Sequence, residues 1–210
     1  MNNFGSSFLI GRYLKWIIIG VVVLGLLGWV VSSYNSIVTL NENTEEQWSQ
    51  VRTAYQRRFD LIPNLVETVK GSADFEKSTL ENVINARSKV GSMNITSDML
   101  NDPEKMKAFE QAQSGFQGAL SRLMVVVEKY PDLKTTEQFA NLMVQLEGTE
   151  NRINQERRKF NEVVKDYNKR IRTFPGNLFA GMFGFEKKSY FEGDTANEQA
   201  PAVGNIFKDK

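Results

Sequence analysis

The chain carries two hydrophobic patterns, and the first is an unbroken apolar run near its start. No charged residue occurs between Trp16 and Asn41, and the densest part reads WIIIGVVVLGLLGWVV. Crossing the apolar core of a bilayer takes roughly 20 apolar residues at ~1.5 Å of rise per residue. Lipid offers no partners for backbone amides, so such a segment must be helical. The pattern therefore predicts a transmembrane helix over residues 13–33, preceded by a short N-terminal segment at 1–12.

Aromatic residues mark both ends of this predicted helix. Trp16 lies at one end, and Trp29 and Tyr34 lie at the other. Tryptophan and tyrosine are enriched at membrane–water interfaces because their rings are amphipathic. We therefore expect these three residues to anchor the helix in the bilayer.

Flanking charge predicts the orientation of the helix. The first 15 residues carry only positive charge, from Arg12 and Lys15, whereas the opposite flank opens with acidic residues. The positive-inside rule then favours a cytoplasmic N-terminus and an exported main domain in a bacterial inner membrane. A cleaved signal peptide has a similar basic start, but this apolar run is long for one, and Val30 to Ser33 is a poor cleavage site.

The second pattern is an amphipathic stripe that repeats in steps of three and four residues over residues 34–174. Such spacing is typical of long helices that bury one face, and near a 3.5 period it resembles a coiled coil. The register begins before residue 48, so one helix is expected to leave the membrane and enter the domain without a linker. The positions in its first and last stretches are Trp48, Val51, Tyr55, Phe59, Ile62 and Val69, then Phe139, Leu142, Leu146, Thr149, Ile153, Glu156, Phe160, Val163, Tyr167, Ile171 and Phe174.

Prolines and glycines predict where these helices break. Pro63 removes the hydrogen bond to the carbonyl of Phe59, so a kink or short break is expected there, and Gly71 is a second weak point. Asp102 and Pro103 are typical of a helix start. The expected fold is all-α: an N-terminal transmembrane helix followed by an elongated antiparallel bundle of three to four long helices.

Residues 175–192 form a glycine-rich stretch that is dense in large apolar side chains, with a polar tail expected to be disordered at 193–210. Two interpretations stay open for this stretch. It is either a short helix that caps the bundle or an exposed apolar patch that meets a membrane or a partner. In the second case Phe179, Phe183 and Phe185 are the candidate interaction residues.

Composition argues against several classes of enzyme. The chain has no cysteine and no histidine, and its 26 basic residues nearly balance 25 acidic ones. It therefore has no thiolate nucleophile and lacks the commonest general base and metal ligand. No phosphate loop or hydrolase motif is present. We expect no catalytic activity, cofactor, metal, nucleic-acid partner or small-molecule substrate.

Acidic residues on the helices are the remaining candidates for chemistry. Glu147 and Glu150 lie three residues apart, and Asp60 precedes Pro63. Carboxylate metal sites in bundles combine glutamate with histidine, which is absent here. Pairing of these acids with arginines across the bundle is the simpler interpretation. Polar positions within the apolar stripes, such as Thr149 and Glu156, would then set register or oligomeric state, or would lie in a partly exposed seam.

Several blocks of the sequence resemble the LemA family in order and spacing. They are YNSIV at 34–38, RRFDLIPNLVETVKG at 57–71, ALSRLMVVVEKYPDLK at 119–134, LEGTENRI at 146–153 and YNKRIRTFPGNLFAGMFGF at 167–185. The resemblance implies a bacterial, membrane-anchored helical bundle with no established enzymatic activity. The shared positions to which it assigns no role include Asp60, Pro63, Asn64, Glu147, Glu150 and Asn151.

Two functions fit these observations. The first is a non-enzymatic, membrane-anchored scaffold or adaptor of the bacterial envelope, which binds protein partners through its helices and self-assembles in one version of the hypothesis. The second is a sensor whose continuous helix relays a signal to a separate protein. An enzyme that uses carboxylates alone would need a cleft, which a narrow bundle rarely provides.

Overall fold

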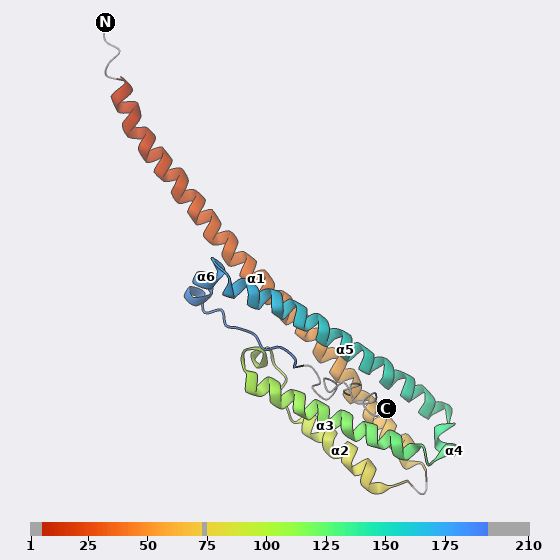
Figure 1. Cartoon of the computed structure of the whole chain (residues 1–210). Helices are drawn as coiled ribbons and strands as arrows, with labels where there is room; N and C mark the ends of the chain where they lie inside the picture. Colours follow the sequence, from red (N-terminus) through yellow and green to blue (C-terminus); the bar gives the residue numbers. More distant parts are fainter. Residues whose placement is uncertain (1–5, 73–74, 193–210) are drawn as a thin grey trace, which may run out of the picture.

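The computed structural model of the chain describes residues 6–72 and 75–192. Throughout this part of the chain the regular structure is helical, as predicted (Figure 1). The elements are α1 (Ser6–Lys70), α2 (Lys77–Gly91), the 3-10 helix η1 (Ser97–Asn101), α3 (Pro103–Val127), α4 (Pro131–Lys134), α5 (Glu137–Arg172) and α6 (Gly176–Phe183). The tail expected at 193–210 lies outside the described residues.

Helix α1 joins the predicted membrane span to the bundle without interruption. Its 65 residues would extend over about 100 Å at ~1.5 Å per residue. Its apolar N-terminal part is long enough to cross a membrane and buries none of its side chains within the protein. A core helix would be covered by its neighbours, so this exposure favours a membrane anchor. Figure 1 shows this part of α1 projecting alone from one end of the bundle.

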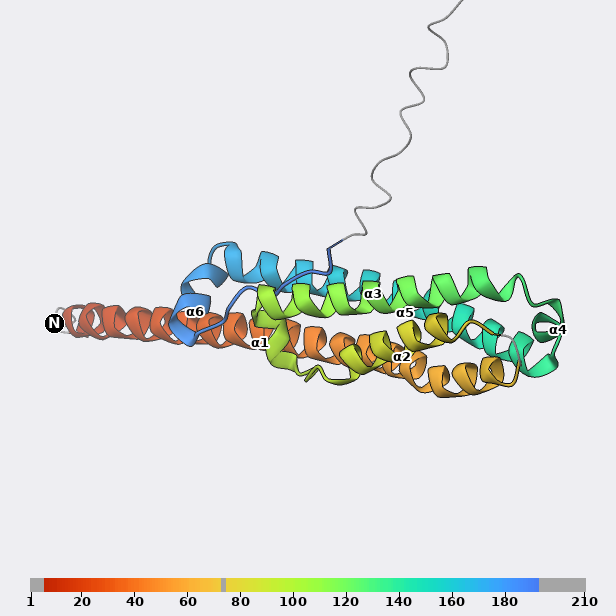
Figure 2. The ribbon, with the colours of Figure 1, turned by 90° about the horizontal axis from the view of Figure 1, so that it is seen from below.

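The other helices fold against the second half of α1 as an antiparallel four-helix bundle. Helix α2 runs back toward the membrane-proximal end, α3 runs away from it, and α5 returns along α1 (Figures 1 and 2). The closest helix pairs are α1 with α5 and α2 with α3. This short-loop arrangement follows from amphipathic helices that must cover one another's apolar faces.

The apolar core forms three successive clusters along the bundle. The distal cluster surrounds Leu65, Val83 and Phe116, and the middle one surrounds Trp48. The third, at the membrane-proximal end, contains Ile37. Most predicted stripe positions are buried. Val163 is a near miss because its neighbour Val164 is the fully buried residue, and Phe174 is wrong because it is 75% exposed.

The helix does not break at Pro63, because α1 continues through this residue to Lys70 and turns only at Gly71, the second expected weak point. Proline leaves the carbonyl of Phe59 without its helical donor. Arg87 of α2 supplies a replacement, since its Nε donates to this oxygen at 3.4 Å. The Arg87 guanidinium also lies 3.8 Å from the centroid of the Phe59 ring. Tertiary contacts therefore compensate for the proline.

This compensation predicts coupling between Pro63 and Arg87. We expect Arg87→Ala to lower the free energy of unfolding by about 1–2 kcal/mol, because it leaves a carbonyl unpaired and removes a cation–π contact. The cost should be smaller in a Pro63→Ala background, where residue 63 donates to Phe59 itself. Chemical denaturation of the four proteins of this double-mutant cycle measures the difference. Equal costs in both backgrounds would contradict the account.

Polar residues and prolines define the ends of the later helices. The Asp102 carboxylate accepts from the backbone amides of Glu104 and Lys105, and Pro103 occupies the first turn of α3, as predicted. Helix α3 ends at Val127, and Pro131 begins the short α4. Helix α5 ends at Arg172, shortly before Pro175.

Residues 175–192 include the short helix of the first interpretation, and part of the apolar surface of this helix is exposed, as the second interpretation requires. Helix α6 folds against α1 at the membrane-proximal end of the bundle, and part of its surface stays exposed. Figure 2 shows the following segment running back along the bundle without forming a helix. Helix α6 therefore covers one end of the bundle, and the extended segment after it lies along the bundle surface.

Candidate functional site

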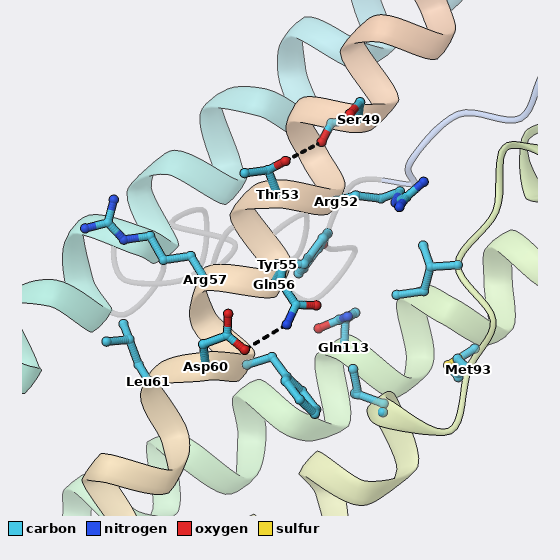
Figure 3. Close-up of a pocket in the computed structure, with 14 residues that line it drawn as sticks. Ser49, Arg52, Thr53, Tyr55, Gln56, Arg57, Asp60, Leu61, Met93 and Gln113 are labelled. Atoms are coloured by element: carbon cyan, nitrogen blue, oxygen red, sulfur yellow. Dashed lines mark hydrogen bonds between the residues drawn. The ribbon is translucent and has the colours of Figure 1, made fainter.

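A groove lies between α1 and the loop that follows α2 (Figure 3). Its volume is about 630 Å³, and its floor and walls combine apolar side chains with a polar rim. A mixture of this kind is typical of protein interfaces, which have an apolar centre and a polar edge. The residues that line it are Ser49, Arg52, Thr53, Tyr55, Gln56, Arg57, Phe59, Asp60, Leu61, Val90, Gly91, Met93, Ile95 and Gln113.

Polar side chains on successive turns of α1 form one wall of the groove. Gln56 donates to the Asp60 carboxylate at 2.7 Å, one helical turn away. Arg52 and Arg57 extend to opposite sides of α1 (Figure 3), and neither has an ion pair among the described residues. The sequence singled out Asp60 without its surroundings, and the structure places its exposed side chain in this wall. The groove thus offers two cations, one anion and several hydrogen-bonding groups beside apolar side chains.

Glycine suits the point where the end of α2 meets the Phe59 ring. A Cβ at Gly91 would lie 3.1 Å from two carbon atoms of this ring. A larger residue here would therefore require the ring to move by a few tenths of an ångström.

Beneath the groove, a buried arginine joins three helices. Arg58 of α1 donates to Glu150 of α5 at 2.7 Å and to the side-chain oxygen of Gln113 of α3. Its guanidinium also lies 5.2 Å from the Tyr55 ring and 5.3 Å from that of Phe116. Burial raises the pKa of Tyr55 to about 12, although nearby arginines oppose this shift, so the phenol stays neutral. This polar cluster holds the floor of the groove in place.

A buried acid, Glu156, links α5 to α1. Glu156 is almost fully buried and accepts a hydrogen bond from Gln47 at 2.6 Å. Arg152 and Lys159 lie 2.9 and 3.3 Å from its other oxygen. Burial alone would raise the pKa of Glu156, but the hydrogen bonds and cations outweigh it and hold the pKa below its usual value. The polar seam predicted at this position is therefore buried and satisfied.

The lowered pKa predicts a pH dependence. Because the folded carboxyl binds a proton less readily than the unfolded one, its contribution to stability is present above the unfolded pKa. That contribution is lost as the pH falls through the lower, folded pKa. We expect wild type to exceed Glu156→Gln in free energy of unfolding by more at pH 7 than at pH 3. Urea unfolding at both pH values measures this, and a pH-independent difference would contradict it.

The extended segment after α6 is held by two asparagines of α5. The side-chain amide of Asn168 donates to the Lys188 carbonyl and accepts from the Lys188 amide, at 2.8 and 2.9 Å. Asn161 makes the same pair of bonds with Phe191, at 3.0 and 2.9 Å. The two asparagines therefore bind backbone as a neighbouring strand would. The sequence reasoning missed them, although their spacing of seven residues on one helix face was a usable signal.

The predicted acidic candidates mostly remain apart from one another. Glu150 pairs with Arg58 across the bundle, which confirms the expected arginine pairing for this acid. Asp60 instead accepts from Gln56 of its own helix. Glu147, Asn151 and Asn64 are exposed, and no role is assigned to them by their contacts. In the described part of the chain, no group of three acidic side chains is placed to hold a metal ion.

Aromatic side chains gather where α1 leaves the predicted membrane span. The Phe179 ring lies 5.6 Å from that of Trp29, and the Phe183 and Phe185 rings lie 4.8 and 5.9 Å from Tyr34. Phe179 is buried by this packing, Phe185 is half-buried, and Phe183 is exposed. Two of the three predicted anchor residues, Trp29 and Tyr34, thus form one cluster with the candidate interaction residues. Trp16, at the other end of the predicted span, is exposed. Phe183 alone of the three phenylalanines is exposed.

These features define a class of protein: a helical bundle with one candidate membrane span continuous with its first helix. The chain belongs to the LemA family, whose profile matches residues 47–204. It is 28% identical to magnetosome protein MamQ 2 of Paramagnetospirillum magneticum, over 89% of this chain and 75% of the relative. MamQ of Magnetospirillum gryphiswaldense is also 28% identical, over 95% and 80%. Protein LemA of Metamycoplasma hominis is 24% identical, over 84% and 77%.

Proposed function

We propose that this protein is a non-enzymatic, membrane-anchored scaffold that holds a partner protein close to a bacterial inner membrane. The observation that carries the proposal is the uninterrupted helix α1, which leaves no flexible linker between the span and the bundle. A partner bound to the bundle would therefore keep a defined distance from the bilayer. The positive charge of the N-terminal flank supports a cytoplasmic N-terminus and an exported bundle.

The groove along α1 is the partner site in this proposal. It lies on the helix that crosses the membrane, and its apolar floor with a polar rim suits a peptide segment of a protein. The cluster around Arg58 braces its floor from below. A preformed surface of this kind loses little conformational freedom when a partner binds.

Site-specific photo-crosslinking in native membranes tests the site. A photoreactive amino acid at Gln56, on the groove wall, is expected to give a discrete adduct whose protein component is identified by mass spectrometry. The matched control is Gln117, which is exposed on α3 and does not line the groove. Arg52→Glu should abolish the adduct at position 56 while the helical content of the protein stays unchanged. Identical adducts at positions 56 and 117, or none at 56, would reject the proposal.

A sensor is the second candidate, and the same continuous helix favours it. A shift of α1 within the bilayer would reach the bundle directly, because α5 packs along its whole soluble half. Hydrogen exchange of the full chain in nanodiscs distinguishes this function. A ligand that changes the protection of both α1 and α5 supports a sensor, and unchanged protection across a metabolite panel argues for the scaffold.

A further inference from the structure

Helix α6 lies beside the end of the membrane span, and its outward side is apolar. Two exposed side chains, Leu178 and Met182, are four residues apart and so share one face of α6. They are 57% and 74% exposed, and Phe183 beside them is 47% exposed. Phe174, in the turn that leads into α6, is 75% exposed. Large apolar side chains gathered at one place on a surface mark a site of interaction.

Contacts with α1 place this face at the level where the span ends. The Trp29 and Tyr34 rings pack on Phe179 and Phe183, so α6 lies beside the last turns of the apolar segment. Arg170, in the last turn of α5, donates to the Ser33 hydroxyl at 3.3 Å. The end of α5 is therefore also tied to the C-terminal boundary of the predicted span. Helix α6 and the C-terminal end of α5 therefore lie at the level of the membrane–water interface.

The backbone at the start of α6 fixes its return toward α1. A Cβ at Gly176 would lie 2.0 Å from the carbonyl oxygen of Arg170, so only glycine allows the two backbones to approach this closely. Side chains on one side of α6, including Phe179 and Ala180, are buried against the bundle. The opposite side is left pointing away from it, and its position is set by packing on the inner side.

We propose that α6 is an interfacial helix whose exposed apolar side chains enter the same bilayer that α1 crosses. Leu26, Leu27 and Val31, near the C-terminal end of the predicted span on α1, are exposed as well, so a single lipid phase would cover both the span and α6. Lys169 and Arg172, exposed in the last turn of α5, suit the phosphate headgroups above. An amphipathic helix in this position lies in the plane of the interface. The bundle then has a second membrane contact, which restricts its tilt.

The inference rests on α1 as a membrane span but not on the groove as a partner site. The test uses the full chain in vesicles of phosphatidylcholine and phosphatidylglycerol, with no other protein present. Since the chain has no cysteine, Met182→Cys, Val23→Cys and Lys129→Cys can each be labelled singly with an environment-sensitive fluorophore. Position 23 is the control within the span, and the exposed position 129 is the control at the distal end of the bundle.

We expect a blue-shifted emission at position 182 and quenching by a spin label on the lipid chains to an extent comparable with position 23. Position 129 should show neither effect. Quenching at 23 but not at 182 would overturn the interfacial helix and leave the anchor intact. No quenching at 23 would overturn the membrane span on which the inference rests. A signal at 182 that disappears on dilution of the protein into more lipid would show that a second copy covers α6, which also overturns it.

Discussion

Replacing Arg58 with alanine is expected to lower the free energy of unfolding by about 3 kcal/mol, since breaking a buried ion pair costs roughly 3–5 kcal/mol. We expect a loss at the lower end of this range, because the Glu150 side chain is 28% exposed and can be rehydrated. Gln113 is buried and would lose its charged partner. For a domain of this size the midpoint of thermal unfolding should fall by roughly 10 °C.

Two comparisons separate the ion pair from lost packing. Arg57→Ala removes the neighbouring, exposed arginine and should change stability by less than about 0.5 kcal/mol. In a Glu150→Ala background, Arg58→Ala should cost less than in wild type, because the pair is already broken. If Arg58→Ala lowers the free energy of unfolding by no more than Arg57→Ala does, Arg58 does not hold α1, α3 and α5 together.

Replacing Phe191 with alanine is expected to cost about 3 kcal/mol, near the lower end of the values for buried phenylalanines. Its ring is 3% exposed and lies 5.4 Å from the Phe160 ring and 5.9 Å from that of Trp48. The Arg157 guanidinium covers it at 4.9 Å from its centroid. This residue fastens the extended segment into the middle of the core, so its loss both opens a cavity and releases the segment.

Hydrogen exchange measures whether the extended segment is released in Phe191→Ala. Hydrogen exchange should accelerate at the amides of Lys188 and Phe191, which the α5 asparagines protect in the native protein. Tyr190→Ala is the matched control, because the neighbouring Tyr190 is 37% exposed. This substitution should lower the free energy of unfolding by less than about 1 kcal/mol. Slow exchange that persists in Phe191→Ala would mean that the asparagine bonds alone hold the segment.

Local patterns were sufficient to predict the helical fold. Steps of three and four residues identified the buried faces of α1 and α5, because a helix on the surface of a bundle places its apolar side chains on the side that faces the core. The Asp102–Pro103 start followed from capping chemistry alone. Pro63 failed as a predictor because the residue that satisfies the freed carbonyl, Arg87, comes from another helix. Such compensation depends on tertiary contacts that a local rule does not contain.

The candidate sites were less predictable for the same reason. Glu150 was expected to pair with an arginine, but the sequence offered several, and only the bundle geometry selects Arg58. The path of residues 184–192 has no periodicity to reveal it, since an extended backbone is held there by side chains of α5. The groove arises from the relative position of α1 and the loop after α2. None of these features is encoded within a single helix.

The central claim is that the membrane span and the first bundle helix are one rigid element. A pair of spin labels at Ser32→Cys and Gln50→Cys tests it most directly, since both positions are exposed and the chain has no other cysteine. The 18 residue steps from position 32 to position 50 make about five turns, which corresponds to a separation of about 27 Å along a continuous helix. In lipid nanodiscs, electron-spin distance measurements should give a single narrow distribution near this value. A broad distribution, or a second population at shorter distance, would show a hinge between membrane and bundle and would contradict the account.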